Sequence, residues 1–164
     1  MNAVDPVPAR DVRFSATTDV VVVGLGIAGC CAALGAREAG AEVVALECAG
    51  GTGGTSAMSG GVLYLGGGTS VQRACGWEDS ADAMHRFLDA ALGPGADADR
   101  LAAYCAGSVE HFDWLVGLGM PFRAAFCDEP NRESADDSAL IFSGGEDSFP
   151  FDEITPPVPR GHKP

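Results

Sequence analysis

Three glycines and one glutamate stand at a spacing that could hold the phosphates and sugar of a dinucleotide. The glycines are Gly24, Gly26 and Gly29 in the segment GLGIAG, and Glu47 follows Gly29 by eighteen positions. In such a segment the first glycine permits a tight turn, the second lets the backbone approach a pyrophosphate, and the third lets a helix pack on a strand. The acidic residue would accept hydrogen bonds from the hydroxyls of an adenosine ribose, and its charge disfavours a 2′-phosphate. The pattern therefore predicts a site for NAD or FAD, and not for NADP.

The elements that must position these residues follow one another in the required order. Residues 19–23 consist of one acid and four valines, which indicates a buried parallel strand. A helix of small residues opens around Gly26 and covers residues 30–39, where Gly40 is placed to end it. Residues 42–46 predict a second strand. A GxGxxG pattern alone is weak, and this context is what makes it specific.

The start of that helix is where phosphates are expected. The first N–H groups of a helix have no acceptor within it, and its dipole is positive at this end, so Ile27 and Ala28 would lie closest to the phosphates. The alternative interpretation is a glycine-rich turn that binds nothing.

A second group of glycines favours FAD over NAD. An NAD domain usually continues into another helix and strand, whereas this chain continues with GGTGGTSAMSGG, residues 50–61. Backbone amides and hydroxyls at this density can line an extended ligand that carries phosphates and a polyol. The alternative is a flexible, solvated loop, but a pure linker would not carry Met58 and the apolar residues 62–65.

Two amphipathic helices are expected after this loop, which extends over residues 49–68. Ser80 can cap a helix that runs through Leu92, with Gly93-Pro94 as its stop. Asp97 or Asp99 can cap a second helix that runs to about residue 116. The predicted fold class is α/β: a Rossmann-like βαβ unit with following helices and an incomplete parallel sheet.

The chain divides into three parts by composition. Residues 1–18 look like a loose leader, and residues 19–127 carry the predicted FAD-binding portion. Residues 128–164 form an acidic segment, in which residues 128–153 hold nine acids and one arginine. A short strand is expected at residues 140–142.

Charge and composition exclude several classes of partner. The 164 residues carry a net charge of −13 and no basic stripe, so nothing attracts a nucleic-acid backbone. Two long uncharged stretches, residues 20–36 and 48–72, contain too many glycines to form a stable helix in lipid, so no membrane partner is expected. Fourteen of the 23 glycines fall between Gly24 and Gly68 without a three-residue period, which excludes a collagen.

The cysteines do not point to a metal. None of the six forms a CxxC pair, and no histidine stands at zinc-ligand spacing from them. The N-terminus has no apolar stretch of export-signal length, so reduced thiols and a cytoplasmic location are expected. The oligomeric state is left open.

At this point the residues resemble a known family. The stretch VVVVGLGIAGCCAALGAREAGAEVVALE is similar to the N-terminal FAD fingerprint of the fumarate reductase and 3-ketosteroid dehydrogenase flavoproteins, and GGTSAMSGG is similar to their second flavin-contacting segment. Three further pieces, VLYLGGGTSVQ, LVGLGMPF and FPFDEITPPVPRGHKP, most resemble the branch that acts on the C4–C5 bond of 3-oxosteroids. The resemblance covers nearly all of residues 18–164.

The resemblance implies roles for eleven residues. It implies phosphate contacts at Gly24, Gly26, Ala28 and Gly29, and a ribose contact at Glu47. It implies pyrophosphate or ribityl contacts at Gly54, Thr55 and Ser56, and places Ser59, Gly60 and Gly61 near the isoalloxazine ring. Family members are much longer than this chain, which would correspond to their N-terminal portion leading towards a substrate-cap domain. The acid–base residues are therefore expected beyond residue 164, and no catalytic residue is assigned here.

Three functional interpretations stay open. The chain is the FAD-binding part of a 3-ketosteroid dehydrogenase that passes a hydride from a small-molecule substrate to flavin N5, or of a fumarate-reductase-type flavoprotein, or it is a truncated FAD-binding module without catalysis. Whether this chain alone is an enzyme is undecided. Tyr64 is either an active-site phenol or a buried aromatic residue below the flavin loop.

Overall fold

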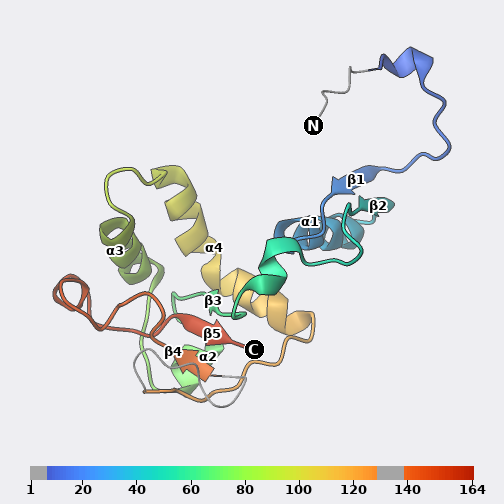
Figure 1. Ribbon diagram of the computed structural model, residues 1–164. Coiled ribbons are helices and arrows are strands. Elements are labelled where there is room, and N and C mark those ends of the chain that lie inside the picture. The colour runs from blue at the N-terminus through green and yellow to red at the C-terminus, as the bar shows by residue number, and fades with distance from the viewer. Residues whose placement is uncertain (1–6, 129–138) are drawn as a thin grey trace. The chain divides into compact units, whose positions relative to one another are not determined.

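The chain forms two compact units that separate between Ser59 and Gly60. The structure, a computed structural model, describes residues 7–128 and 139–164. Figure 1 labels the helices and strands of both units. This division reflects contacts within the chain, and the boundaries expected from composition, at residues 18 and 127, stay predictions.

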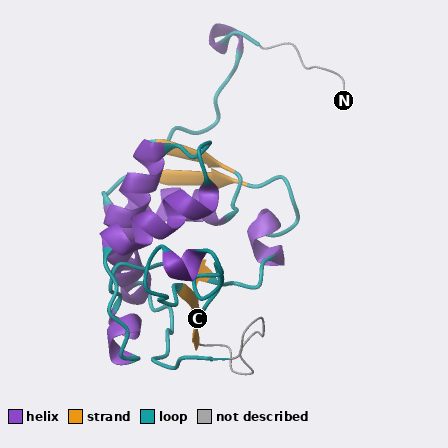
Figure 2. Ribbon diagram, turned by 90° about the vertical axis from the view of Figure 1, so that its left-hand side faces the viewer, coloured by secondary structure: helices purple, strands orange, loops and turns teal. Residues whose placement is uncertain are grey.

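The first unit is the predicted βαβ arrangement. It contains, in order, the 3₁₀ helix η1 (Ala9–Asp11), the strand β1 (Val20–Val23), the helix α1 (Ile27–Glu38), the strand β2 (Val43–Leu46) and the 3₁₀ helix η2 (Gly54–Met58). The two strands are parallel, with Val20 paired to Val43 and Val23 to Leu46, and they lie side by side in Figure 2. β-Branched side chains suit these strands, and Gly40, at φ +87°, ends the helix as expected. The two predicted strands and the helix between them are confirmed.

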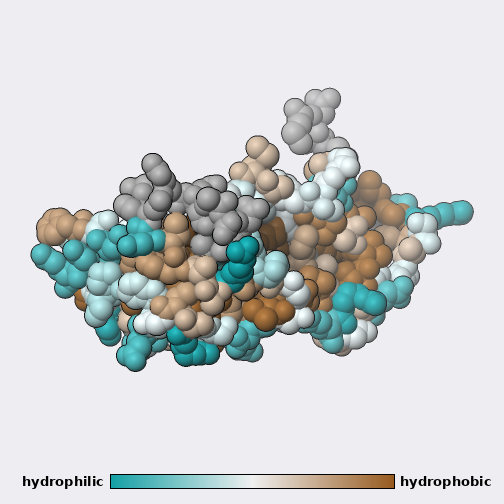
Figure 3. Space-filling view, turned by 90° about the horizontal axis from the view of Figure 1, so that it is seen from below, coloured by the Kyte–Doolittle hydropathy of each residue, from teal (hydrophilic) through white to brown (hydrophobic). Residues whose placement is uncertain are grey.

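One face of this small sheet is open. Val22 is buried, whereas Val21, Val23, Val44 and Leu46 point to the other face and are exposed. Within the described residues the parallel sheet has two strands, so it is incomplete as predicted. Hydrophobic surface is visible in the space-filling view, interspersed with hydrophilic surface (Figure 3).

The second unit packs helices with a small antiparallel sheet. Its elements are α2 (Ser70–Ala74), α3 (Ala81–Leu92), α4 (Ala98–Gly117), η3 (Phe151–Glu153), and the strands β3 (Leu63–Tyr64), β4 (Ala139–Ile141) and β5 (Gly161–Lys163). β5 is the central strand and pairs antiparallel with β3 on one side and with β4 on the other. The last residues of the chain thereby lie beside the strand that follows the second glycine segment.

The caps of the two long helices explain where they begin. Ser80 Oγ accepts a hydrogen bond from the N–H of Ala83 at 3.1 Å, and Asp97 Oδ1 accepts one from Arg100 at 3.1 Å. Both residues are good caps because their side-chain oxygens pair with N–H groups that the helix leaves free. Ser80 is thus confirmed as a cap, and Asp97, not Asp99, begins α4.

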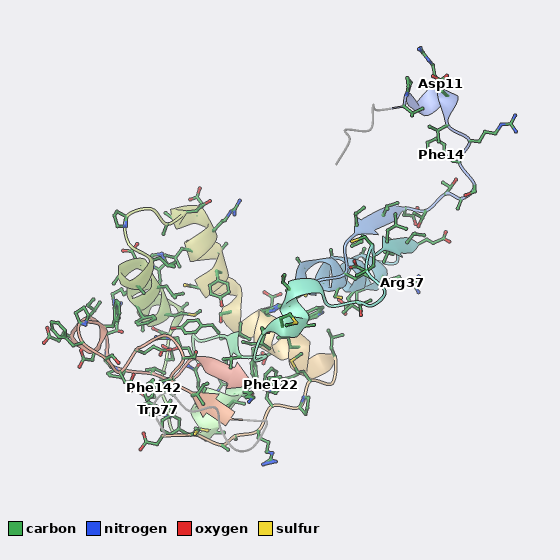
Figure 4. All side chains as sticks on the ribbon, in the orientation of Figure 1. Asp11, Phe14, Arg37, Trp77, Phe122 and Phe142 are labelled. Carbon is green, nitrogen blue, oxygen red and sulfur yellow. The ribbon has the colours of Figure 1, made fainter. Side chains whose placement is uncertain are left out.

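The core of this unit is built on the predicted apolar faces of the two long helices. Two clusters of buried side chains form it: Leu65, Val71, Phe112, Leu115 and Leu140, and Met84, Leu101 and Cys105. Aromatic rings extend the first cluster, and Trp77 meets Phe142 edge to face with ring centroids 5.7 Å apart (Figure 4).

The structure corrects three expectations about secondary structure. The loop expected over residues 49–68 contains η2 and β3. The strand expected at residues 140–142 is β4, which begins one residue earlier. The sequence does not predict α2 or β5. These elements are shorter than the windows over which hydrophobic periodicity can be recognised. Residues 129–138 of the acidic segment lie outside the described residues.

Candidate functional site

The turn between β1 and α1 depends on Gly24. This residue has φ +90°, a conformation that side-chain-bearing residues rarely adopt, and its N–H donates to the carbonyl of Leu46 at 2.7 Å. The turn is therefore attached to the end of the neighbouring strand. This is the tight turn that the sequence predicts at the first glycine.

Gly29 lets α1 pack closely on this turn. A Cβ added to Gly29 would overlap the carbonyl oxygen of Gly24 and lie 3.4 Å from Cγ1 of Val22. The close helix–strand packing predicted for the third glycine is thus present in the structure.

Gly26, in contrast, is not required by the protein's own packing. It is the N-cap of α1, and a Cβ added there would make only ordinary contacts, 3.7 Å from Ser56 Oγ and 3.8 Å from the carbonyl oxygen of Gly53. The backbone conformation of Gly26, φ −72° and ψ −177°, is also open to any residue. A glycine here leaves the backbone at the start of α1 uncovered by a side chain.

Glu47 directly follows β2, and its side chain is hydrogen-bonded to the glycine turn. Its carboxylate accepts hydrogen bonds from the N–H of Leu25 at 2.8 Å and from the N–H of Ala49 at 3.0 Å. These bonds lower the pKa of Glu47 from 4.5 to about 2, and the bond from Ala49 has the largest effect. Hydrogen bonds from the side chain and the backbone of Cys48 also lower this pKa. The side chain is therefore ionised at neutral pH. Sequence reasoning predicted the ribose contact and missed the structural role.

The second glycine segment lies against the first. The N–H of Gly53 donates to the carbonyl of Leu25 at 2.7 Å, and the N–H of Ile27 at the start of α1 donates to Ser56 Oγ at 3.2 Å. A Cβ added to Gly54 would lie 3.8 Å from Cα of Gly26.

The structure thus gathers most of the predicted cofactor residues within one unit. That unit contains Gly24, Gly26, Ala28, Gly29, Glu47, Gly54, Thr55, Ser56 and Ser59. Gly60 and Gly61 begin the other unit.

These features fit FAD. The first-turn amides of α1 and the positive end of its dipole suit a pyrophosphate, the ionised Glu47 suits a ribose diol, and Gly26 leaves its backbone accessible. In the part of the chain that the structure describes, no three His, Cys, Asp or Glu side chains are grouped to hold a metal ion. None of the described helices combines the length and the apolar character needed to cross a membrane.

Tyr64 belongs to the second unit, where its hydroxyl is buried. Its ring stacks on Phe87 with centroids 6.3 Å apart, and the pKa of its phenol is raised, chiefly by burial and then by the nearby carboxylate of Glu146. One side of the ring lines a cavity of about 720 Å³ whose other walls include Leu88, Leu101 and Tyr104. A phenol with a raised pKa keeps its proton at neutral pH and releases it with difficulty, so the packing interpretation of Tyr64 fits better than the catalytic one.

The second unit also contains a buried polar network that sequence reasoning missed. The guanidinium of Arg160 forms two hydrogen bonds with the carboxylate of Asp79, Nε to Oδ2 at 2.9 Å and Nη2 to Oδ1 at 2.8 Å, and both side chains are fully buried. Asp79 Oδ2 also accepts from the N–H of Gly67 and from Gln72 Nε2. The pair joins the loop before α3 to the residue before β5.

His162 continues this network in its neutral form. Its Nδ1 lies 3.0 Å from the carbonyl oxygen of Arg160, and its Nε2 lies 2.9 Å from Thr69 Oγ1. Because a carbonyl oxygen can only accept, Nδ1 carries the proton and Nε2 accepts from the threonine hydroxyl. Thr69 Oγ1 in turn accepts from the N–H of Gln72, which completes the capping box of α2.

Comparison with known proteins supports FAD as the cofactor. The family described as FAD binding domain matches residues 19–146. The 3-oxo-5-alpha-steroid 4-dehydrogenase of Comamonas testosteroni is 35% identical over 158 residues, which cover 94% of this chain and 29% of that protein.

Two solved structures resemble the chain as well. The 3-ketosteroid-delta4-(5alpha)-dehydrogenase of Rhodococcus jostii RHA1, in complex with 4-androstene-3,17-dione, is 50% identical with a TM-score of 0.92, over 97% of this chain and 33% of that one. A flavocytochrome c3 fumarate reductase in its open conformation is 29% identical with a TM-score of 0.62, over 92% of this chain and 22% of that one.

The chain spans about a third of the length of these two steroid 4-dehydrogenases, from Comamonas testosteroni and Rhodococcus jostii. The match nevertheless includes the glycine turn, Glu47 and the second glycine segment, because residues 19–146 contain all of them. The chain therefore belongs to the FAD binding domain family, within the flavoproteins that include the fumarate reductases and the 3-ketosteroid dehydrogenases, and its cofactor is FAD.

Proposed function

We propose that this chain is the FAD-binding portion of a flavin-dependent dehydrogenase that oxidises the C4–C5 bond of a 3-ketosteroid. The observation that carries this proposal is the 50% identity, with a TM-score of 0.92 over 97% of the chain, to the Rhodococcus jostii enzyme. FAD supplies the hydride acceptor, flavin N5, and the protein supplies position and electrostatics.

The residues of the first unit would hold the adenosine and pyrophosphate end of FAD. In this proposal the phosphates lie at the start of α1, against Gly24, Gly26, Ala28 and Gly29. The N–H of Ile27, expected near the phosphates, already donates to Ser56 Oγ. The positive end of the helix dipole and the other first-turn N–H groups would stabilise an anion there.

Glu47 would bind the ribose. Its carboxylate has an amide donor on each oxygen, which fixes its position, and it would also accept a hydrogen bond from a sugar hydroxyl. Its low pKa, about 2, supports this role because the charged form accepts the stronger hydrogen bond.

The second glycine segment would hold the rest of the cofactor. Gly54, Thr55 and Ser56 would contact the pyrophosphate or the ribityl chain, and the segment Ser59–Gly61 would lie near the isoalloxazine ring. The position of Ser56 Oγ, 3.2 Å from the N–H of Ile27, supports a place for this segment at the phosphate end.

A titration with FAD tests the cofactor residues. The fluorescence of FAD is followed as the 164-residue chain is added, for the natural chain, for Glu47→Gln and for Glu42→Gln. Glu42 is an exposed acid directly before β2 whose side chain is not assigned to the site, so it is the matched control. We expect Glu47→Gln to weaken binding about ten-fold or more and Glu42→Gln to leave it unchanged, since a charged hydrogen bond contributes about 1.5–3 kcal/mol. Equal affinities for the two variants would contradict the ribose assignment.

A chimaera tests the steroid assignment. Residues 19–164 replace the matching segment of the Rhodococcus jostii enzyme, and flavin reduction by a 4,5-saturated 3-ketosteroid is followed. We expect the chimaera to bind FAD and to dehydrogenate the steroid. A folded, FAD-loaded chimaera that does not react would contradict the proposal. Reaction with a dicarboxylate in place of the steroid would favour the fumarate-reductase alternative, and FAD binding without either reaction would favour a non-catalytic module.

A further inference from the structure

The helix α1 begins without a capping side chain of its own. Its N-cap residue is Gly26, which has no side chain to accept the first N–H groups of the helix. An oxygen comes instead from Ser56, 29 positions further along the chain, whose Oγ accepts the N–H of Ile27 at 3.2 Å. Ile27 is the first residue of α1 and Ser56 lies in η2, so the second glycine segment supplies a cap for the helix.

The backbone around Ser56 is held at this place by other contacts. The N–H of Gly53 donates to the carbonyl of Leu25 at 2.7 Å, and a Cβ added to Gly54 would lie 3.8 Å from Cα of Gly26. These main-chain contacts pack the start of η2 on the glycine turn without involving the Ser56 hydroxyl. The hydroxyl is therefore positioned at the start of α1 by the fold of the segment.

The Ser56 hydroxyl can form a second kind of hydrogen bond. A serine hydroxyl both accepts hydrogen bonds and donates its own hydrogen. Because Oγ accepts from Ile27, its O–H can still be donated, and accepting from an N–H polarises the hydroxyl and strengthens it as a donor. The side chain of Ser56 is only half-buried, so a ligand can reach it.

We propose that Ser56 links the start of α1 to the pyrophosphate of FAD, with Oγ keeping the bond from Ile27 while its O–H donates to a phosphate oxygen. This inference rests on the proposed function, which places the phosphates at the start of α1. An ionised phosphate oxygen only accepts, so the hydroxyl must be the donor, and the negative charge makes this bond stronger than one between neutral groups. The positive end of the helix dipole would then act on the pyrophosphate partly through Ser56.

The alternative is that the pyrophosphate displaces the Ser56 hydroxyl and takes the N–H of Ile27 itself. The two arrangements predict opposite effects when the hydroxyl is removed. If Ser56 links helix and phosphate, its removal loses a bond and weakens binding, whereas if Ser56 is displaced, its removal frees the N–H and leaves binding equal or tighter. The contacts of Gly53 and Gly54 favour the link, because they keep η2 beside the turn whichever partner the hydroxyl has.

Calorimetric titration of the 164-residue chain with ADP and with FAD tests the link. ADP carries the adenosine ribose and the pyrophosphate but neither the ribityl chain nor the flavin ring. We expect Ser56→Ala to weaken the binding of both ligands about ten-fold, because a hydrogen bond to a charged acceptor is lost. Ser56→Thr keeps the hydroxyl and should restore the natural affinity. Thr52→Ala removes an exposed hydroxyl of the same segment that is not assigned to the site, so it is the matched control.

The other outcomes of this titration have distinct meanings. Equal or tighter ADP binding by Ser56→Ala would overturn the proposal in favour of displacement. A loss for FAD alone would also overturn it, since it would place Ser56 at the ribityl chain. If the natural chain bound neither ligand, the placement of FAD on which this proposal rests would be wrong, whereas natural binding that Ser56→Ala reproduces would contradict this proposal alone.

Amide hydrogen exchange of Ile27 measures the cap without any ligand. We expect this N–H to exchange faster in Ser56→Ala than in the natural chain, and at the natural rate in Ser56→Thr. Equal rates in all three proteins would contradict the cap and with it the proposal.

Two further variants decide the question if Ser56→Ala does not fold. Ser56→Asp and Ser56→Asn both keep an oxygen that can cap α1, but only asparagine also has N–H donors, and aspartate adds a negative charge. We expect Ser56→Asp to bind ADP at least ten-fold more weakly than Ser56→Asn, since it has no donor for the phosphate and repels it. Equal affinities of these two variants for ADP would refute the proposal.

Discussion

The carbonyl oxygen of Gly24 occupies the space that a side chain on Gly29 would need. Gly24 begins the turn after β1, and Gly29 lies in the first part of α1. Contact between these two backbones brings the start of the helix against the carboxyl end of the strand. The third glycine of the pattern therefore acts through packing, whereas the packing of this unit does not require a glycine at position 26.

Replacing Gly29 by alanine should damage the first unit. The added methyl group would collide with the Gly24 carbonyl, and overpacking of this kind costs about 1–3 kcal/mol. We expect weaker FAD binding and earlier unfolding of this unit, measured by FAD titration and by the amide NMR signals of residues 20–46.

Gly35→Ala is the control on the same helix. Nothing lies within 4 Å of a Cβ added to Gly35, and alanine is the better helix former, so this variant should be more stable by about 0.5–1 kcal/mol. If both variants behaved alike, the packing role of Gly29 would be wrong.

Arg160→Met should strongly destabilise the second unit. It removes one member of a fully buried ion pair and leaves the carboxylate of Asp79 uncompensated, which costs about 3–5 kcal/mol. The measurement is urea unfolding followed by tryptophan fluorescence, which reports on this unit because Trp77 and Trp114 both belong to it.

Arg100→Met tests whether burial is the cause. Arg100 pairs with Asp97 at 3.2 Å, but both side chains are exposed, so the loss should not exceed about 1 kcal/mol. A loss for Arg160→Met as small as that for Arg100→Met would show that the buried pair does not hold this unit together.

The second unit should lose stability in mild acid because of His162. Burial, opposed by the bond to the Arg160 carbonyl, lowers the pKa of His162 from 6.5 to about 4. The unfolded chain then takes up a proton near pH 6.5, whereas the folded chain takes it up only near pH 4. Stability is therefore fully present above pH 6.5 and falls by about 3 kcal/mol as the pH drops to 4. Urea unfolding at several pH values, with NMR titration of the imidazole, measures both quantities.

His162→Asn is the variant that isolates this effect, because it cannot take up the proton and should lose the pH dependence between 6.5 and 4. Asp79 does not contribute in that range. Burial alone would raise the pKa of Asp79, but hydrogen bonds from Arg160 and Gly67 bring it below 3.8, so its share of stability is lost at lower pH. An unchanged slope between pH 6.5 and 4 in His162→Asn would rule out the histidine as the source.

Phe112→Ala should show how much the aromatic core contributes. Phe112 is fully buried on α4, with its ring centroid 4.8 Å from that of Phe122 and 5.1 Å from that of His162. Its truncation should cost about 3–5 kcal/mol, whereas Phe149→Ala, at a position 77% exposed, should change the free energy of unfolding by no more than about 0.5 kcal/mol. Fluorescence-detected urea unfolding compares the two, and comparable losses would contradict the assigned core.

The sequence by itself determined the first unit and its cofactor class. A run of four valines, a glycine turn, a helix of small residues and a second strand are local signals, and each was placed to within a few residues. The fit of Gly24 and Gly29 also follows from local geometry, since both residues belong to the same turn and helix. Ser80 was recognisable as a cap because its partner stands only three positions away.

Only the tertiary structure decided the rest. Asp79 and Arg160 are 81 positions apart in the sequence, and Thr69 and His162 are 93 positions apart. The hydrophobic periodicity of the sequence could therefore not predict that these residues pair. The strands β3 and β5 are too short for a pattern of their own and exist because each supplies the other's hydrogen bonds. Even Glu47, found from its spacing, has a second role that became visible only when the fold placed the N–H of Leu25 beside its carboxylate. Long-range hydrogen bonds depend on where distant segments meet, and that meeting is fixed by the packing of the whole unit.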